Sequence, residues 1–367
     1  MNAIIPKEAA TEIRGQIDRQ LAELAMGRVD KAGLMDMLVK DPAIGGRIAS
    51  LAGADKAKAG VMSYGATAPP ERKSLFRLPQ KYDPMAELRG LIGLDTVKAQ
   101  VEKTVNLINL SRTRQKEGLP QLDLTHHLVF TGNPGTGKTT VARLVGQIYC
   151  SLGVLSSGHM LEVDRGNLIA PYVGHTALLV KNVVAHALDG VLFIDEAYSL
   201  TYDLESSKDF GPEAIQALIK LMEDYRSRLV VIVAGYTEEM NKFIYSNPGL
   251  ASRFKTFIEF TDYNGAELFR IFDYMAVQSG CRLTLPARIE AAALMNTLKS
   301  GAASGNARTV RNVFEECLAR QAARLAVHGR KKVDVRMLEA GDVPKIDELE
   351  TLFASMAPRA KSASKES

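Results

Sequence analysis

The amino-acid sequence predicts an α/β protein: a doubly wound parallel sheet, followed by a small all-α domain and preceded by a short helical unit. Three observations lead to this fold. Short apolar segments alternate with helical patterns, one segment runs into a glycine-rich loop that opens a helix, and the strand pattern stops after residue 262. Short apolar runs between helices are typical of parallel strands covered on both faces. We expect strands at 127–131, 159–163, 191–195, 229–234 and 256–260.

Composition and periodicity divide the chain into five parts. Helical patterns near 264–278, 286–300 and 308–327 form the domain after the sheet, and the polar residues after Pro358 are typical of a disordered tail. We expect a helical N-terminal unit at 1–55, a linker at 56–81, an α/β domain at 82–262, a small helical domain at 263–345, and a C-terminal helix with the tail at 346–367.

The N-terminal unit shows helical spacing of apolar residues, as at Ile13, Ile17 and Leu21. These apolar faces either pack on one another or bind a partner, and both readings stay open. The linker is rich in Ala, Gly, Lys and Pro, with Pro69-Pro70 at its centre, which favours a flexible chain.

The glycine-rich loop at 132–139 fits the G-x-x-x-x-G-K-[ST] pattern of a phosphate-binding P-loop. Glycines let backbone N–H groups curl around phosphate oxygens, and the following helix N-terminus favours negative charge. In this pattern Lys138 reaches the β- and γ-phosphates and the Thr139 hydroxyl binds Mg²⁺. The bare pattern also arises by chance, so a second motif is needed. The predicted ATP contacts are Gly132, Asn133, Pro134, Gly135, Thr136, Gly137, Lys138, Thr139 and Thr140.

The second motif is Asp195-Glu196 at the end of the apolar run 191–194. Ligands of open α/β sheets bind at the carboxyl ends of the strands, where these two carboxylates are expected. One carboxylate there holds Mg²⁺, and the adjacent one orients or deprotonates the attacking water. Together the two motifs predict ATP hydrolysis, with Asp195 as an ATP and Mg²⁺ contact and Glu196 as the catalytic residue.

Composition excludes several other classes. The net charge is only +4, which makes no case for nucleic acid, and three scattered cysteines form no disulfide framework or metal cluster. The N-terminal residues lack the apolar core of a signal peptide, and no apolar run approaches the ~20 residues of a membrane span. We therefore expect a cytoplasmic protein with no membrane span.

Several further blocks of sequence follow one another in a specific order. They are Phe130–Thr140, Tyr172–Ala177, Val191–Tyr198, Ala234–Tyr236, Ser246–Phe254 and Asn306–Asn312. Through these blocks, residues ~84–345 resemble an AAA+ ATPase. The similarity is greatest to the group of red-type Rubisco activases (CbbX/CfxQ), sporulation stage V protein K and the ATPase of type VII secretion. It does not include residues 1–80.

The resemblance implies roles for individual residues. Arg253 matches the arginine finger that reaches the γ-phosphate of a neighbouring subunit, and Arg308 matches the sensor-2 arginine of the helical lid, both assigned to catalysis. Ile92 and Gly93 belong to the segment that wraps the adenine. Arg311, one turn after Arg308, is expected at the helix surface or in an interdomain ion pair.

The resemblance also implies a hexameric ring that acts on a protein client. Tyr172, Val173 and Gly174 occupy the first pore-loop position, where an aromatic side chain grips an extended polypeptide through its apolar area. Many AAA+ ATPases carry Asn or Thr at the end of the strand after the Asp-Glu motif, but here that place is Gly235-Tyr236. Tyr236 and Thr237 are both candidates for the first-sensor task.

Three functions remain open. The first is an ATP-driven, chaperone-like protein remodeller in which residues 1–55 dock the client. The second is a Rubisco activase-type remodeller of a single enzyme. The third is a nucleotide-gated assembly scaffold, against which Glu196 and Arg253 argue. A nucleic-acid translocase is disfavoured by the near-neutral charge.

Overall fold

The computed structural model describes residues 82–120, 122, 124–170, 174–201, 210–298, 305–327 and 334–349. All of them belong to one of the two units into which the chain divides, Glu71–Ser367. The expected N-terminal unit at 1–55, the linker at 56–81 and the tail after residue 349 lie outside the described residues.

The centre of this unit is a five-stranded parallel sheet in the order β2-β3-β4-β1-β5. Each strand coincides with a predicted apolar segment to within one residue at either end. The three central strands are buried along their whole length, whereas each of the two edge strands also has half-buried and exposed residues. The strands are β1 (Leu128–Gly132), β2 (Met160–Val163), β3 (Gly190–Ile194), β4 (Leu229–Gly235) and β5 (Thr256–Phe260).

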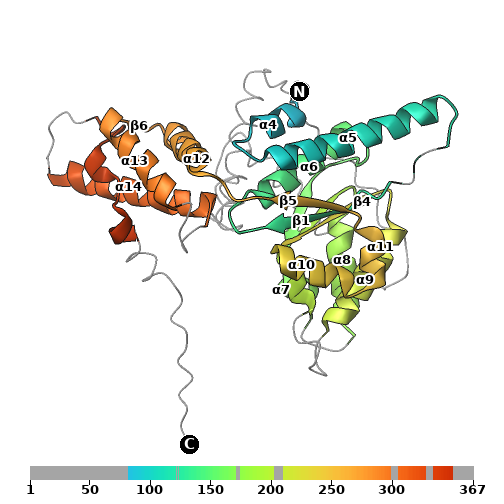
Figure 1. The fold of residues 1–367 in the computed structure, drawn as a ribbon. Helices are drawn as coiled ribbons and strands as arrows, with labels where there is room; N and C mark the ends of the chain where they lie inside the picture. Colours follow the sequence, from blue (N-terminus) through green and yellow to red (C-terminus); the bar gives the residue numbers. More distant parts are fainter. Residues whose placement is uncertain are drawn as a thin grey trace, which may run out of the picture. The chain divides into compact units, whose positions relative to one another are not determined.

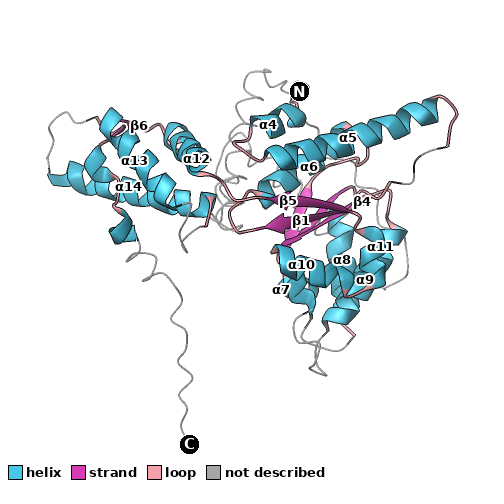
Figure 2. Ribbon diagram, in the orientation of Figure 1, coloured by secondary structure: helices cyan, strands magenta, loops and turns pink. Residues whose placement is uncertain are grey.

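The direction of each crossover determines which face of the sheet a helix covers. Parallel crossovers are right-handed, so a connection that steps one way along the sheet lies on the opposite face from one that steps back. The step from β1 to β2 runs against the other three, and its helix α6 (Lys138–Ser151) therefore lies on the opposite face from the helices of the later crossovers. Figures 1 and 2 show this division, with α4, α5 and α6 on one face and α7 to α11 on the other.

The remaining helices of this part follow in chain order. They are α4 (Pro84–Gly90), α5 (Asp95–Lys116), α7 (Arg165–Leu168), α8 (Thr176–Ala187), the 3₁₀ helix η1 (Ala197–Thr201), α9 (Gly211–Asp224), α10 (Thr237–Tyr245) and α11 (Pro248–Arg253).

Two apolar cores fill the spaces on either side of the sheet. Side chains alternate across a strand, so Phe130 joins the core under α6 while its neighbour Val129 joins the core under α8 to α11. Helix α6 supplies its own apolar stripe at Val141, Val145 and Ile148, all fully or almost fully buried. The sheet is therefore sandwiched, which leaves only its edges and strand ends for ligands.

A helical lid follows the sheet, as predicted. It consists of α12 (Gly265–Gln278), α13 (Leu285–Leu298) and α14 (Ala307–Val327). The sequence did not indicate two short parallel strands beside these helices, β6 (Arg282–Leu283) and β7 (Met337–Leu338), with η2 (Ala340–Asp342) following β7. Strands of two residues carry no measurable periodicity, which is why the sequence pattern missed them.

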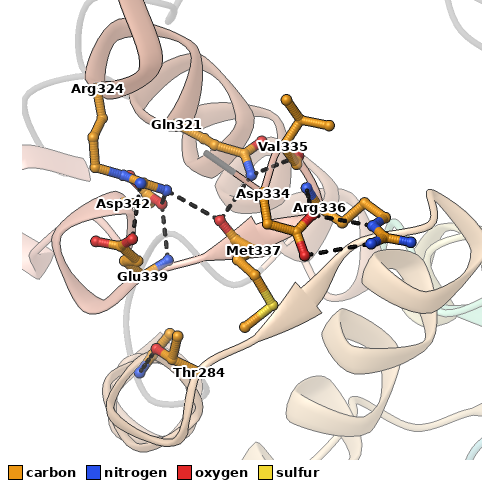
Figure 3. Close-up of polar contacts among 10 residues, drawn as sticks. Thr284, Gln321, Arg324, Asp334, Val335, Arg336, Met337, Glu339 and Asp342 are labelled. Carbon is orange, nitrogen blue, oxygen red and sulfur yellow. Dashed lines mark hydrogen bonds and ion pairs between the residues drawn. The ribbon is translucent and has the colours of Figure 1, made fainter. Parts of the chain in front are cut away.

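Side chains of α14 hold the β7 segment in place, as Figure 3 shows. The Arg324 guanidinium donates to both carboxylate oxygens of the buried Asp342, at 2.9 and 2.8 Å, and to the Met337 carbonyl at 3.0 Å. Gln321 Nε2 donates to the carbonyls of Val335 and Met337 at 3.1 and 3.0 Å. Burial alone raises the pKa of Asp342, but the Arg324 hydrogen bonds hold it below its ordinary value. Charge-assisted hydrogen bonds thus attach the segment of β7 and η2 to α14, in addition to the apolar core of the lid.

Candidate active site

The glycine-rich loop joins β1 to α6 with three glycines at positive φ: Gly132 at 143°, Gly135 at 73° and Gly137 at 96°. At two of them a side chain has no room. A Cβ on Gly132 would lie 2.2 Å from the Phe260 carbonyl oxygen, and one on Gly135 would lie 2.2 Å from the Gly305 carbonyl oxygen. Helix α6 begins at Lys138, so its first unpaired N–H groups face the loop.

A cavity of about 370 Å³ opens at the carboxyl ends of β1, β4 and β3. The strand order explains its composition, because β4 lies between β1 and β3 and all three strands end at the same edge. The cavity therefore gathers residues from the loop, from the Asp-Glu motif and from the lid. Its lining comprises Gly132, Pro134, Gly135, Gly137, Lys138, Thr139, Thr140, Asp195, Glu196, Gly235, Tyr236, Met275, Ala307, Arg308 and Arg311.

Lys138 folds back on its own loop in this structure. Its Nζ donates to the carbonyl oxygens of Gly132 and Asn133, both at 2.8 Å. Burial lowers the pKa of Lys138, and the neighbouring Asp195 carboxylate opposes that shift. The ammonium group is thus held at the loop with its positive charge directed into a cavity that also contains Asp195 and Glu196.

Asp195 and Glu196 form the turn that leaves β3. The Asp195 N–H continues the sheet by donating to the Val163 carbonyl at 3.0 Å, and Asp195 Oδ1 accepts from the Glu196 N–H at 3.1 Å. Glu196 has a φ of 47°, a left-handed conformation that costs a non-glycine residue about 1–2 kcal/mol. This turn exposes the Glu196 side chain at the cavity wall while Asp195 stays half-buried.

The lid reaches the loop through the start of α14. The Ala307 N–H donates to the Gly135 carbonyl at 3.1 Å, and the next residue, Arg308, lies on the cavity wall. Arg311 lines the same wall, although we expected it at the helix surface or in an ion pair. Its spacing of three residues from Arg308 was the signal that could have found it, because residues i and i+3 share a helix face.

The segment predicted to wrap an adenine lies beside the loop. A Cβ on Gly137 would be 3.6 Å from Leu94 Cδ1, and Gly93 has a φ of 62° with Glu267 and Tyr263 packed against it. Ile92 and Gly93 are not part of the cavity lining itself, and neither are Asn133 and Thr136. The buried Thr136 stabilises the loop from behind by donating to the Asn133 carbonyl at 2.8 Å.

Arg253 is the one predicted catalytic residue placed away from this cavity. At the end of α11 its Nη2 pairs with Glu223 Oε2 of α9 at 3.0 Å, and its Nη1 donates to the Gly249 carbonyl at 3.3 Å. Tyr172 and Val173 of the predicted pore loop lie outside the described residues. Gly174 precedes α8 with a φ of 77° and has open space around it.

Residue choice at the end of β4 follows from packing. A Cβ on Gly235 would lie 2.6 Å from the Tyr198 ring, so only glycine fits. Tyr236, exposed at 38%, lines the cavity, whereas Thr237 begins α10 and does not. Met275 is a cavity residue that the sequence did not predict, whereas Tyr236 was one of the two candidates for the first-sensor task.

The donor set of the cavity fits a magnesium ion. Mg²⁺ is held by one or two protein groups plus substrate phosphates and water, and the Thr139 hydroxyl and Asp195 carboxylate in one cavity supply such groups.

Among the described residues, no helix has the length and apolar character needed to cross a membrane.

Comparison with known proteins agrees with this geometry. The family described as "ATPase family associated with various cellular activities (AAA)" matches residues 128–262, and an AAA lid domain matches residues 264–352.

Three curated relatives are similar over most of their length. The chain is 42% identical to Protein CbbX of Cereibacter sphaeroides, over 68% of this chain and 81% of that protein. It is 42% identical to the chloroplastic ribulose bisphosphate carboxylase/oxygenase activase of Cyanidioschyzon merolae, over 70% and 88%. It is 39% identical to stage V sporulation protein K of Bacillus subtilis, over 70% and 80%. The chain therefore belongs to the AAA family of ATPases and carries the AAA lid domain, in the group that includes CbbX, Rubisco activase and stage V sporulation protein K.

Proposed function

We propose that this ATPase works as a ring that uses ATP hydrolysis to remodel a protein client. The observation that carries the proposal is the cavity itself, which combines Lys138, Thr139 and two adjacent carboxylates with an arginine from the lid. A site that only binds nucleotide does not need Glu196 held beside Asp195 in a costly backbone conformation.

The residues of the two motifs and Arg308 each have a chemical task in this proposal. The loop amides and Lys138 bind the phosphates, and the Thr139 hydroxyl and Asp195 hold Mg²⁺, which neutralises phosphate charge when bound. Glu196 accepts a proton from the attacking water as a general base. Arg308 reports the γ-phosphate to the lid, because it stands at the start of α14, which contacts the loop.

The proposed ring is supported by Arg253, which is not part of the cavity lining of its own subunit. We propose that it completes the site of a neighbouring subunit, in a hexamer like those of the family. A head-to-tail interface of this kind closes into a ring when the rotation from one subunit to the next adds up to a full turn. The client would be gripped in the central channel by Tyr172, Val173 and Gly174, with residues 1–55 as a docking unit.

A Rubisco activase-type function is the second candidate. It is favoured by the 42% identity to a protein named as a ribulose bisphosphate carboxylase/oxygenase activase, which spans 88% of that protein. Both functions share the same site and differ only in the client.

The test of the ATPase site uses two substitutions with opposite consequences. Lys138→Ala removes the charge that faces the phosphates, so calorimetry should show ATP binding lost. Glu196→Gln spares the phosphate contacts and removes the base, so ATP should still bind while turnover falls by roughly 10²–10⁴. Glu238→Gln, an exposed acid on α10, is the matched control and should keep parent turnover. Parent-rate hydrolysis by Glu196→Gln would show that another group activates the water.

The test of the client role uses Tyr172→Ala. A pore-loop tyrosine contacts the client and not the phosphates, so basal ATPase should stay within a few-fold of the parent while remodelling of a bound client is lost. Tyr245→Ala, which removes a tyrosine exposed at 72% on α10, is the control. If both variants remodel the client equally well, the gripping role belongs elsewhere.

A further inference from the structure

The structure assigns to Asn306 a task that no binding motif describes: it is a positioning residue that fastens the lid helix α14 to the phosphate-binding loop through the carboxylate of Asp262. The inference rests on the proposed function, since it concerns how the ATP cavity is held together. It differs from the task of Arg308, which contacts the nucleotide itself.

The contacts form a short chain from loop to lid. Asn133 Nδ2 of the loop donates to both oxygens of Asp262, at 3.0 and 2.9 Å. Asn306 Nδ2 donates to Asp262 Oδ1 at 2.8 Å and to the Pro134 carbonyl at 3.3 Å. One carboxylate after β5 thus accepts hydrogen bonds from an amide of the phosphate-binding loop and from an amide at the start of α14.

The orientation of the Asn306 amide is determined by its other end. Its Oδ1 accepts from the Tyr263 N–H at 3.0 Å, so its Nδ2 must face Asp262 and the loop. Asn306 is only 2% exposed and has a φ of 51°, which asparagine tolerates better than most residues. A buried amide in this conformation has little freedom to turn away, so the contact is specific.

Two neighbouring contacts fix the same junction. The Ala307 N–H donates to the Gly135 carbonyl at 3.1 Å, and the Tyr263 hydroxyl donates to the Thr136 carbonyl at 3.2 Å. Helix α14 therefore starts from a point bound to the loop, and Arg308 and Arg311 on that helix line the cavity.

The consequence is preorganisation of the ATP site. Without the hydrogen bonds to Asp262, nucleotide binding would also have to order the lid against the loop. The free-energy cost of that ordering would weaken the binding. A buried polar group left without its partner adds its own cost. We therefore expect substitutions in this junction to weaken nucleotide binding without touching a group that contacts the nucleotide.

The decisive variant is Asn306→Asp, which keeps the size and the backbone conformation but sets a second carboxylate against Asp262. In the full chain, calorimetry should show ADP binding weakened about tenfold or more. Hydrogen exchange of the peptide containing Ala307 should speed up without nucleotide. Asn241→Asp, at an exposed position on α10, should leave both measurements at parent values.

Rescue distinguishes positioning from general damage. Adding Asp262→Asn to Asn306→Asp restores a donor facing an acceptor at this junction, and the second oxygen position at residue 262 still accepts from Asn133. The double variant should recover part of the ADP affinity, although the Pro134 carbonyl loses its donor. If Asn306→Asp does not fold, Asp262→Asn alone, at an exposed residue, should weaken ADP about threefold or more.

The outcomes separate this inference from the proposed function. The inference is overturned if Asn306→Asp binds ADP as tightly as the parent does. If that variant does not fold, parent ADP affinity in Asp262→Asn overturns it instead. A double variant that binds ADP no better than Asn306→Asp also overturns it. If Lys138→Ala keeps ADP affinity, the proposed function itself fails. Loss of binding in Lys138→Ala with parent binding in Asn306→Asp rejects only the coupling.

Discussion

Glu196 adopts a left-handed backbone conformation, which by itself lowers the stability of the fold. It is one of four non-glycine residues with positive φ in the described part of the chain, together with Leu94, Asp189 and Asn306. Three of the four adjoin the cavity: Glu196 on its wall, Leu94 against Gly137, and Asn306 beneath the loop. Backbone strain that surrounding contacts maintain is a frequent property of functional sites. Its distribution here supports the assignment of the site.

His127 carries a pH dependence that belongs to stability and not to the chemistry. Burial is the main cause that lowers its pKa to about 4, and the Val231 N–H donates to its Nδ1 at 3.0 Å. The unfolded chain binds a proton near pH 6.5, earlier than the folded chain does on acidification. Stability from this residue is therefore complete above pH ~6.5 and is lost as pH falls toward 4, by roughly 3 kcal/mol in total.

We expect His127→Gln to flatten this part of the profile, because glutamine can accept from Val231 and does not titrate. The measurement is the free energy of unfolding in denaturant at several pH values between 4.5 and 7.5. The comparison uses the slope against pH, since the substitution also changes packing. Parallel profiles for the two proteins would show that other groups cause the acid sensitivity.

At the residue scale, motifs predicted the residues adjacent in sequence but not those brought in by packing. Lys138, Thr139, Asp195 and Glu196 belong to contiguous patterns, and the structure gathers them in one cavity. Met275 comes from α12, and only the folded chain brings it to the other residues of the cavity. No periodicity or spacing within that helix encodes this convergence.

At the scale of elements, most of the sheet could be predicted because its strands are short, buried and separated by helices. The Leu91–Leu94 segment was harder, because it forms a bend between α4 and α5 in which Leu94, the N-cap of α5, has the left-handed conformation. The left-handed residue is a leucine, which sequence rules do not expect there.

Gly132 shows how a phosphate-binding motif also serves the packing of strands. Its missing side chain admits the Phe260 carbonyl of β5, which a Cβ would approach to 2.2 Å. We expect Gly132→Ala to destabilise the fold by about 2 kcal/mol or more, through this clash and its positive φ. The measurement is the midpoint of denaturant unfolding without nucleotide.

The matched control for that prediction is Gly90→Ala, on the last residue of α4, where a Cβ meets nothing within 4 Å. It should leave the midpoint unchanged or raise it slightly. Equal midpoints for Gly132→Ala and the parent would limit the glycine to a phosphate-binding task.

At the scale of the whole molecule, the cavity of a single subunit lacks the predicted arginine finger. Arg253 is paired with Glu223 on α9, with its side chain 22% exposed, and is not part of the cavity lining. An exposed ion pair of this kind contributes at most about 1 kcal/mol, so a neighbouring phosphate can displace Glu223. In the proposed ring, Arg253 can therefore reach the site of another subunit at little cost.

This arrangement predicts that two inactive variants restore activity when mixed. Lys138→Ala subunits keep Arg253 but cannot bind ATP, whereas Arg253→Ala subunits bind ATP but offer no finger. In rings assembled at random from equal amounts, about a quarter of the interfaces join an intact cavity to an intact finger. ATPase activity should therefore rise well above that of either variant alone, with native mass spectrometry to show that mixed rings form. Mixed rings that remain inactive would contradict a finger supplied by the neighbour, because the cavity and the finger would then have to work within one subunit.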